Sequence, residues 1–115
     1  MHELSVCLSI LQQVDAIARE RGASRASRIE LRIGPLSGVE PDLLRNAWPL
    51  AAAGSLAEHA ELAISESGIV VHCDSCGAES EATPNRLACP ACKDFRTRVV
   101  SGDEMILQRV ELLTA

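Results

Sequence analysis

Four cysteines in the second half of the chain have the spacing of a metal site. They form two Cys-x-x-Cys pairs separated by twelve residues. Two residues between cysteines allow both sulfurs of one turn to face the same ion, and two such turns complete a tetrahedron. Thiolates favour zinc, and four of them close its coordination shell, leaving no position for water or substrate. We therefore expect a structural zinc ion bound by Cys73, Cys76, Cys89 and Cys92.

Other uses of these cysteines fit the sequence less well. A thioredoxin-like redox pair needs one Cys-x-x-Cys at the start of a helix, whereas this chain has two matched pairs. A rubredoxin-like iron site uses the same ligands but usually lies among aromatic residues, and here only Phe95 is near. Gly77 suits a turn that needs a positive φ, and Pro90 suits the first position of the second turn.

The first three residues, Met1-His2-Glu3, form a second candidate metal site. The α-amine of Met1, the backbone nitrogen of His2 and its imidazole can form fused chelate rings on one ion. Deprotonated amides favour square-planar Ni(II) or Cu(II), and imidazole with carboxylate also suits six-coordinate Ni(II). Glu3 could add an oxygen donor, and its charge also favours the N-terminal end of a helix. By itself, so short a motif more often marks an ordinary solvated terminus.

The remaining thiol and histidines point to structural roles. Cys7 lies on the apolar side of a predicted helix and is expected in the core. His72 adjoins Cys73, but four cysteines already satisfy zinc, so we expect its side chain beside the site or facing solvent. His59 precedes a predicted strand and is expected to be exposed. The sequence has no Ser/His/Asp constellation and no phosphate-binding loop, so we do not expect an enzyme.

The composition weighs against several functional classes. The chain has 115 residues, of which 47% are hydrophobic, and a formal charge of −5. This charge, with one Trp, one Phe and no Tyr, argues against nucleic acid as a partner. No apolar run is long enough to cross a membrane, and His2 and Glu3 stand where a signal peptide would carry Lys or Arg. We therefore expect a cytoplasmic protein with no membrane association, in which disulfides are uncommon.

Two segments have the pattern of helices. Residues 3–21 predict an amphipathic helix. Its expected apolar side consists of Leu4, Cys7, Leu8, Leu11, Val14 and Ala18. Pro41 suits the first turn of a second helix over 41–53. Because Pro49 lacks an N–H and its ring crowds the preceding turn, we expect a kink or an early end near Trp48.

Three segments have the alternating pattern of strands: 27–33, about 60–71, and 104–113. The second could break at Ser67-Gly68. The inward residues are expected to be Ile29, Leu31 and Ile33 in the first strand, Leu62 and Ile64 in the second, and Ile106, Val110 and Leu112 in the last.

The elements and the cysteines together predict an α+β fold. Residues 73–101 contain too little apolar material to bury a core unaided. We expect two helices packed on a small three-stranded sheet, with an inserted four-cysteine zinc-ribbon module. The predicted boundaries are 1–71 plus 102–115 for the α+β domain and 72–101 for the zinc ribbon.

The motifs, taken in order, carry a family resemblance. The chain begins with MHE, has GPLSGVEP at 34–41, then the two cysteine pairs, and SGDEMILQRVEL at 101–112. It resembles the HypA/HybF family, nickel metallochaperones of [NiFe]-hydrogenase maturation, over essentially its whole length. The resemblance implies Ni(II) binding by His2, assisted by Met1 and Glu3, and zinc binding by the four cysteines. It also implies delivery of nickel with a partner GTPase, HypB, to the hydrogenase large subunit. The sequence is compatible with a monomer or a homodimer.

Some positions depart from the family pattern. Trp48-Pro49 stands where members usually have an aromatic followed by a helix former, and Lys93 stands where glycine often follows the fourth cysteine, so that turn is expected to be strained. Residues 93–98 lack the histidine that can reach nickel in some members.

A zinc-ribbon adaptor that binds protein or nucleic acid would explain the cysteines but not the N-terminal motif. The exposed side of the first helix is the expected docking surface for the GTPase; its residues are Gln12, Asp15 and Arg19.

Overall fold

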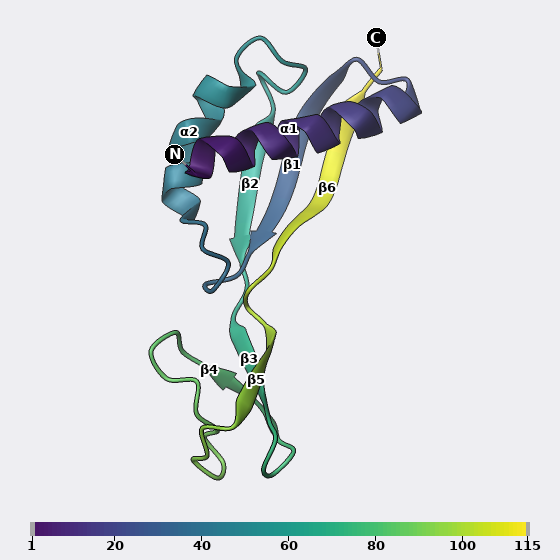
Figure 1. The fold of residues 1–115 in the computed structure, drawn as a ribbon. Coiled ribbons are helices and arrows are strands. Elements are labelled where there is room, and N and C mark those ends of the chain that lie inside the picture. Colours follow the sequence, from purple (N-terminus) through teal and green to yellow (C-terminus); the bar gives the residue numbers. More distant parts are fainter. Residues whose placement is uncertain (1, 115) are drawn as a thin grey trace. The chain divides into compact units, whose positions relative to one another are not determined.

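The computed structural model describes residues 2–114, and the chain divides into two compact units. The helical unit comprises residues 2–31, 39–65 and 106–114, and the cysteine unit comprises residues 32–38 and 66–105. The predicted fold class is confirmed, because two helices accompany a small three-stranded sheet and the cysteines lie in an inserted module (Figure 1). Within 2–114, none of the helices has the length and apolar character needed to cross a membrane.

The helical unit is built on one small sheet. Its strands lie in the order β2 (Glu61–Glu66), β1 (Arg25–Ile33) and β6 (Met105–Leu113). Helix α1 (His2–Arg21) crosses the sheet, and α2 (Pro41–Ala52) packs against α1 (Figure 1). Both helices and the central strand supply the core, whose fully buried large side chains include Ile10, Val14, Ile29, Leu31 and Leu44.

The buried side of α1 differs from the predicted one. Cys7, Val14 and Ala18 are buried as expected, but Ile10 joins them and was not predicted. Leu4 and Leu8 were predicted inward, and this is wrong, since they are 36% and 48% exposed. Two apolar rows run side by side along this helix, and spacing alone does not determine which row faces the core.

Helix α2 passes through its internal proline. The predicted helix over 41–53 is confirmed; of the two outcomes expected at Pro49, a kink or an early end near Trp48, the early end is wrong, because the helix continues to Ala52. Leu44, Trp48 and Ala52 are buried at four-residue steps, so their burial holds the last turn in place. Pro49 is exposed beside this row, near the end of the helix, where the loss of one hydrogen bond costs least.

The strands agree with the predictions in part. The inward residues of β1 are confirmed: Ile29, Leu31 and Ile33 are at most 1% exposed. In β2, Leu62 and Ile64 are half-buried. Ile106 of β6 was predicted inward, and this is wrong, since it is 43% exposed and lies near the beginning of that strand.

The cysteine unit has its own antiparallel sheet. Its central strand β3 (Ile69–Cys73) pairs with β4 (Glu79–Ala82) on one side and with β5 (Thr97–Ser101) on the other. The predicted break at Ser67-Gly68 is confirmed, because β2 and β3 are separate strands in different sheets. Strands β4 and β5 were not predicted.

Three passages of backbone meet at one point of the cysteine unit. The N–H of Gly34 donates to the carbonyl of Glu104 (2.8 Å), and the N–H of Ser67 donates to the carbonyl of Ile33 (3.0 Å). One carboxylate oxygen of Glu104 accepts from the Ser67 hydroxyl (2.9 Å) and from the Gly102 N–H (2.8 Å). Glycine is required for this approach, because a Cβ on Gly34 would lie 2.1 Å from the carbonyl oxygen of Gly102.

Candidate metal centre

The two Cys-x-x-Cys segments form turns with matching backbone hydrogen bonds. In the first turn, the N–H of Gly77 donates to the carbonyl of Cys73 (2.9 Å). In the second, the N–H of Lys93 donates to the carbonyl of Cys89 (2.8 Å). In each turn the N–H of the first cysteine also donates to the carbonyl of the residue five positions later, and both of these bonds are 2.9 Å long. We call the segments 73–78 and 89–94 the first and second cysteine turns. Their shared geometry explains why one spacing recurs in the sequence.

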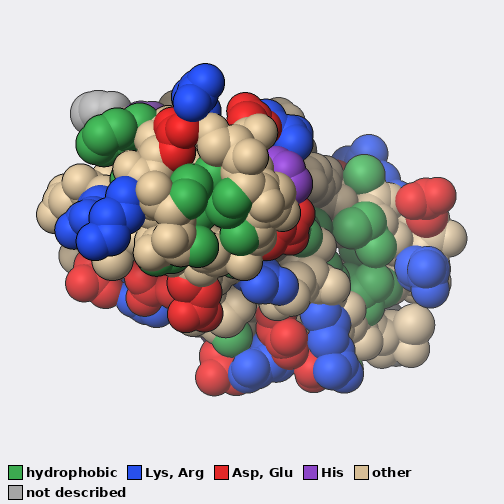
Figure 2. All heavy atoms as spheres, turned by 90° about the horizontal axis from the view of Figure 1, so that it is seen from below, with side chains coloured by type: hydrophobic (Ala, Val, Ile, Leu, Met, Phe, Trp, Pro, Cys, Tyr) green, Lys and Arg blue, Asp and Glu red, His purple; other side chains and the backbone are tan. Residues whose placement is uncertain are grey.

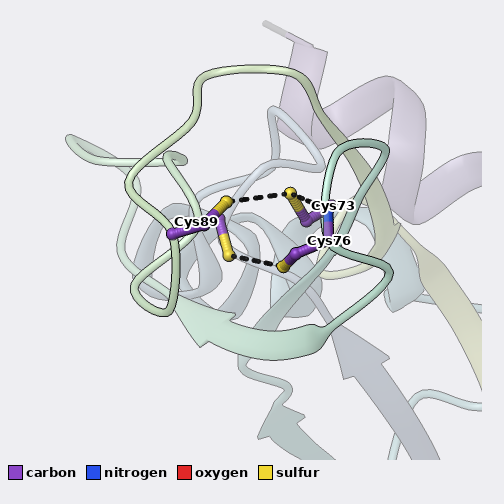
Figure 3. A group of neighbouring side chains, drawn as sticks. Cys73, Cys76 and Cys89 are labelled. Atoms are coloured by element: carbon purple, nitrogen blue, oxygen red, sulfur yellow. Dashed lines mark hydrogen bonds between the residues drawn. The ribbon is translucent and has the colours of Figure 1, made fainter.

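The four sulfur atoms converge on a single point. All lie within 4.8 Å of one another, with Cys73 and Cys92 at 3.5 Å and Cys76 and Cys89 at 3.7 Å (Figure 3). No disulfide joins the described cysteines. A tetrahedron with Zn–S bonds of about 2.3 Å places neighbouring sulfurs about 3.8 Å apart. The donor type, number and separation therefore fit zinc.

Each turn favours, at its first cysteine, the thiolate form that a metal ion requires. The backbone N–H of Cys76 donates to the sulfur of Cys73 (3.4 Å) and lowers the pKa of that thiol. The backbone N–H of Cys92 acts in the same way on Cys89 and lowers its pKa to about 7. Cys73 and Cys89 are buried, whereas Cys76 and Cys92 are exposed. Each turn thus contributes one protected sulfur and one that solvent reaches.

The predicted strain after the fourth cysteine is confirmed. Lys93 has φ +66° and is the one non-glycine residue of 2–114 with a positive φ; its counterpart Gly77 has φ +78°. An L-residue in this conformation costs about 1–2 kcal/mol, a cost that glycine avoids. Lysine at this position therefore weakens the second cysteine turn.

Replacing Lys93 with glycine is expected to stabilise the zinc-loaded protein by about 1 kcal/mol, once the added backbone entropy of glycine is subtracted. Urea unfolding followed by circular dichroism measures the change. Gly77→Ala is the matched control: a Cβ there meets no atom within 4 Å, so it adds strain alone and should destabilise by a similar amount. Equal midpoints for Lys93→Gly and the parent chain would contradict the assignment of strain.

A polar group that the sequence analysis missed lies against the cysteines. Asp94 accepts hydrogen bonds from the guanidinium and backbone N–H of Arg96 and from the Ser75 hydroxyl, and these bonds hold its pKa well below the usual range. The signal in the sequence was an acidic residue two positions after the fourth cysteine and two positions before Arg96. Such a pattern becomes informative only when the turn geometry is known.

The N-terminal candidates lie in the helical unit at the start of α1. His2 is the first residue of the helix, and its imidazole Nε2 lies 3.8 Å from a carboxylate oxygen of Glu3. The His2 side chain is 56% exposed and that of Glu3 is 16% exposed. Met1 lies outside the described residues. The structure therefore brings together two of the three predicted donors, on a surface that solvent reaches.

The other thiol and histidines have the surroundings expected of them. Cys7 is fully buried, and its sulfur donates to the Leu44 carbonyl (3.7 Å); burial, and then the charge of Glu3, raise the pKa of its thiol. His72 Nδ1 lies 3.4 Å from a carboxylate oxygen of Glu79, its partner residue on β4, so the imidazole pairs with this carboxylate and is not one of the metal ligands. His59 is confirmed as exposed.

Charges of both signs are mixed on one face of the molecule (Figure 2). On the face seen in Figure 2, Lys and Arg side chains alternate with Asp and Glu. Such a face lacks the clustered positive charge that phosphate backbones require.

Known proteins resemble this chain over its whole length. The family model described as "Hydrogenase/urease nickel incorporation, metallochaperone, hypA" matches residues 1–112. Hydrogenase maturation factor HypA of Nitrosospira multiformis is 46% identical over 114 residues, 99% of both chains, and that of Chlorobium limicola is 47% identical over 112 residues, 97% of both chains. The solution structure of the Ni metallochaperone HypA from Helicobacter pylori shares the fold, with a TM-score of 0.73 at 23% identity over 98% of both chains. The chain therefore belongs to the HypA family of nickel-incorporation metallochaperones for hydrogenase maturation.

Proposed function

We propose that this chain binds Ni(II) at its N-terminus and delivers it to the large subunit of [NiFe] hydrogenase, together with the GTPase HypB. In this proposal His2 is the principal ligand, Met1 contributes its α-amine, and Glu3 contributes a carboxylate oxygen. The 1–71 plus 102–115 domain carries the nickel, and the 72–101 domain carries a structural zinc on its four cysteines. The single observation that supports it most is the solvent-accessible His2–Glu3 pair at the start of α1 in a chain of this family.

Helix geometry supports the use of the His2 backbone nitrogen. This nitrogen lies at the positive end of the helix dipole, which lowers the cost of deprotonating an amide there. Imidazole, amine and amide donors suit Ni(II), although Cu(II) binds such sites more tightly.

An exposed terminal site suits transfer of the ion. A chaperone must release its cargo, and a nickel ion at the chain end can be displaced one ligand at a time by the thiolates of a target. The zinc site is suited to the opposite task. Its four thiolates complete a closed tetrahedron, so the ion would hold the cysteine unit together without taking part in a reaction, and we assign the chain no catalytic activity.

The partner GTPase would dock where nickel is exchanged. Farther along α1 from His2, the polar side of the helix carries Gln12 and an ion pair between Asp15 and Arg19 (3.0 Å). This polar surface is our proposed contact for HypB in the cytoplasm. Reversing the charges of Asp15 and Arg19 would then weaken the complex while leaving nickel binding unchanged.

A calorimetric nickel titration tests the nickel site. Zinc-loaded protein with a native, untagged N-terminus is expected to bind one equivalent of Ni(II), and His2→Ala is expected to bind none while retaining one zinc per chain. Loss of the imidazole removes the donor that completes the chelate rings. His59→Ala is the matched control, because that histidine is 85% exposed and distant in sequence from the N-terminal motif.

The possible results show whether nickel and zinc occupy different sites. Nickel binding lost in His2→Ala and kept in His59→Ala would support the N-terminal site. Equal binding by all three proteins would remove His2 from the site. Zinc content unchanged across the series would place nickel and zinc at separate sites.

A further inference from the structure

One carboxylate joins the two cysteine turns of the proposed zinc site. Asp94 ends the second turn, two residues after Cys92, and accepts a hydrogen bond from the hydroxyl of Ser75. Ser75 lies between Cys73 and Cys76, inside the first turn. The bond therefore crosses from one pair of ligands to the other. The backbone bonds described above instead close each turn upon itself.

Arg96 fixes Asp94 in the orientation that this bond requires. Its backbone N–H donates to one carboxylate oxygen of Asp94 (2.9 Å), and its Nη2 donates to the other (2.8 Å). The Arg96 carbonyl accepts from the N–H of Asp74 (2.8 Å), which adds a second attachment to the first turn. Asp94 is 23% exposed, so solvent competes weakly for these bonds.

The charge of Arg96 also suits a zinc–thiolate centre. Zinc with four thiolates carries a net charge of −2. The Arg96 guanidinium is held by Asp94 (2.8 Å), which lies two residues after Cys92 and so places this cation on the second cysteine turn.

We propose that Asp94 is a positioning residue that fastens the two cysteine turns together through Ser75 and so controls the rate at which zinc leaves. This inference rests on the proposed zinc site but concerns residues that do not bind the ion. Release begins when a thiolate dissociates, and the exposed Cys76 and Cys92 belong to different turns. The turns must then separate, and separation breaks the Ser75–Asp94 bond. Outer partners of metal ligands commonly change metal affinity by about 10–100-fold.

Zinc release from the full-length, zinc-loaded chain tests the proposal. Excess chromophoric chelator is added, and the first-order rate is compared for the parent chain, Asp94→Asn, Ser75→Ala and the double variant. We expect release to accelerate about 10–100-fold in Asp94→Asn and several-fold in Ser75→Ala. We expect the double variant to match Asp94→Asn, because the uncharged amide is a weaker acceptor and leaves little of the bond for Ser75→Ala to remove. The absorption of the cobalt(II)-substituted proteins should be unchanged, since the four ligands remain.

Asp74→Asn is the matched control. Asp74 is also a carboxylate next to a zinc-binding cysteine, and it is paired with the Nε of Arg98 on β5 (3.0 Å). The Asp74→Asn variant changes the net charge by the same amount as Asp94→Asn but leaves the second cysteine turn unchanged. Its rate of zinc release should therefore stay within about twofold of the parent rate.

Three results would overturn the proposal. Asp94→Asn could release zinc at the parent rate, or Asp74→Asn could accelerate release as much as Asp94→Asn does. The third is a double variant whose acceleration equals the product of the accelerations in Ser75→Ala and Asp94→Asn. If Asp94→Asn does not fold, Ser75→Ala alone decides the matter, because it removes one exposed hydroxyl. A parent chain without zinc would instead refute the zinc assignment, and this is read from the metal content before any rate is measured.

Discussion

Replacing Cys89 with serine is expected to abolish zinc binding and to unfold the cysteine unit. The chain loses one of four thiolates, and the remaining three cannot close a tetrahedral shell. Structural zinc sites contribute about 10–16 kcal/mol of apparent binding free energy. Few large apolar side chains of this unit are buried: Ile33, Ile69 and Val71, in addition to Cys73 and Cys89. With zinc bound as proposed, the unit would therefore depend on the ion for its fold.

Zinc content by atomic absorption and the amide spectrum by NMR measure this effect. The resonances of β3, β4 and β5 should collapse toward the unfolded range, while those of α1 and β1 remain dispersed. Cys7→Ala is the control, because it removes a buried thiol that lies in the helical unit. Retention of one zinc by Cys89→Ser, with a dispersed spectrum throughout, would show that Cys89 is not a ligand.

Replacing Gly34 with alanine is expected to destabilise the protein by about 3 kcal/mol or more, since the new methyl group overlaps backbone rather than a movable side chain. The added Cβ would lie 2.1 Å from the carbonyl oxygen of Gly102 and 2.6 Å from the carboxylate of Glu104. The chain would have to separate here, and the hydrogen bond from the Gly34 N–H to the Glu104 carbonyl would lengthen or break.

Urea unfolding of the zinc-loaded protein, followed by circular dichroism, measures the loss. Gly68→Ala is the matched control, because a Cβ at Gly68 meets no atom within 4 Å and its φ lies outside the left-handed region. That variant should stay within about 0.5 kcal/mol of the parent chain. Equal stability of Gly34→Ala and Gly68→Ala would mean that the three backbone passages are not packed as described.

The cysteine cluster was predictable because its geometry is local. Two residues between cysteines fix the distance between two sulfurs, and a repeat of the motif supplies the other two. The strain at Lys93 followed from the family resemblance, because glycine often occupies this position in members; the structure shows Gly77 in the same conformation in the first turn. Asp94 was not predictable, because its partner Ser75 becomes a neighbour only when the two turns face each other.

The predictions of the fold that were wrong or missing depend on tertiary contacts that the local sequence does not determine. On α1, Leu8 and Ile10 are both apolar and both fit a helical repeat, so the sheet decides which is buried. The end of α2 depended on whether burial of Ala52 outweighs the hydrogen bond lost at Pro49. β4, with the sequence ESEA, carries no apolar alternation and forms because it pairs with β3. Tertiary contacts override local preference at each of these positions.

The bond between Ser67 and Glu104 has a consequence for the order of folding. Strands β1 and β6 come from opposite parts of the chain, and the bonded residues Ser24 and Leu113 are 89 positions apart. Closing so long a loop costs entropy, which grows by about 0.6 kcal/mol for each doubling of length. The sulfur pairs close over only 13 and 19 positions, so the cysteine unit can form first. Its folded ends then lie together at Ser67 and Glu104 and shorten the remaining loop. The supply of zinc would then control how fast the β2-β1-β6 sheet assembles, although that sheet contains none of the cysteines that bind the ion.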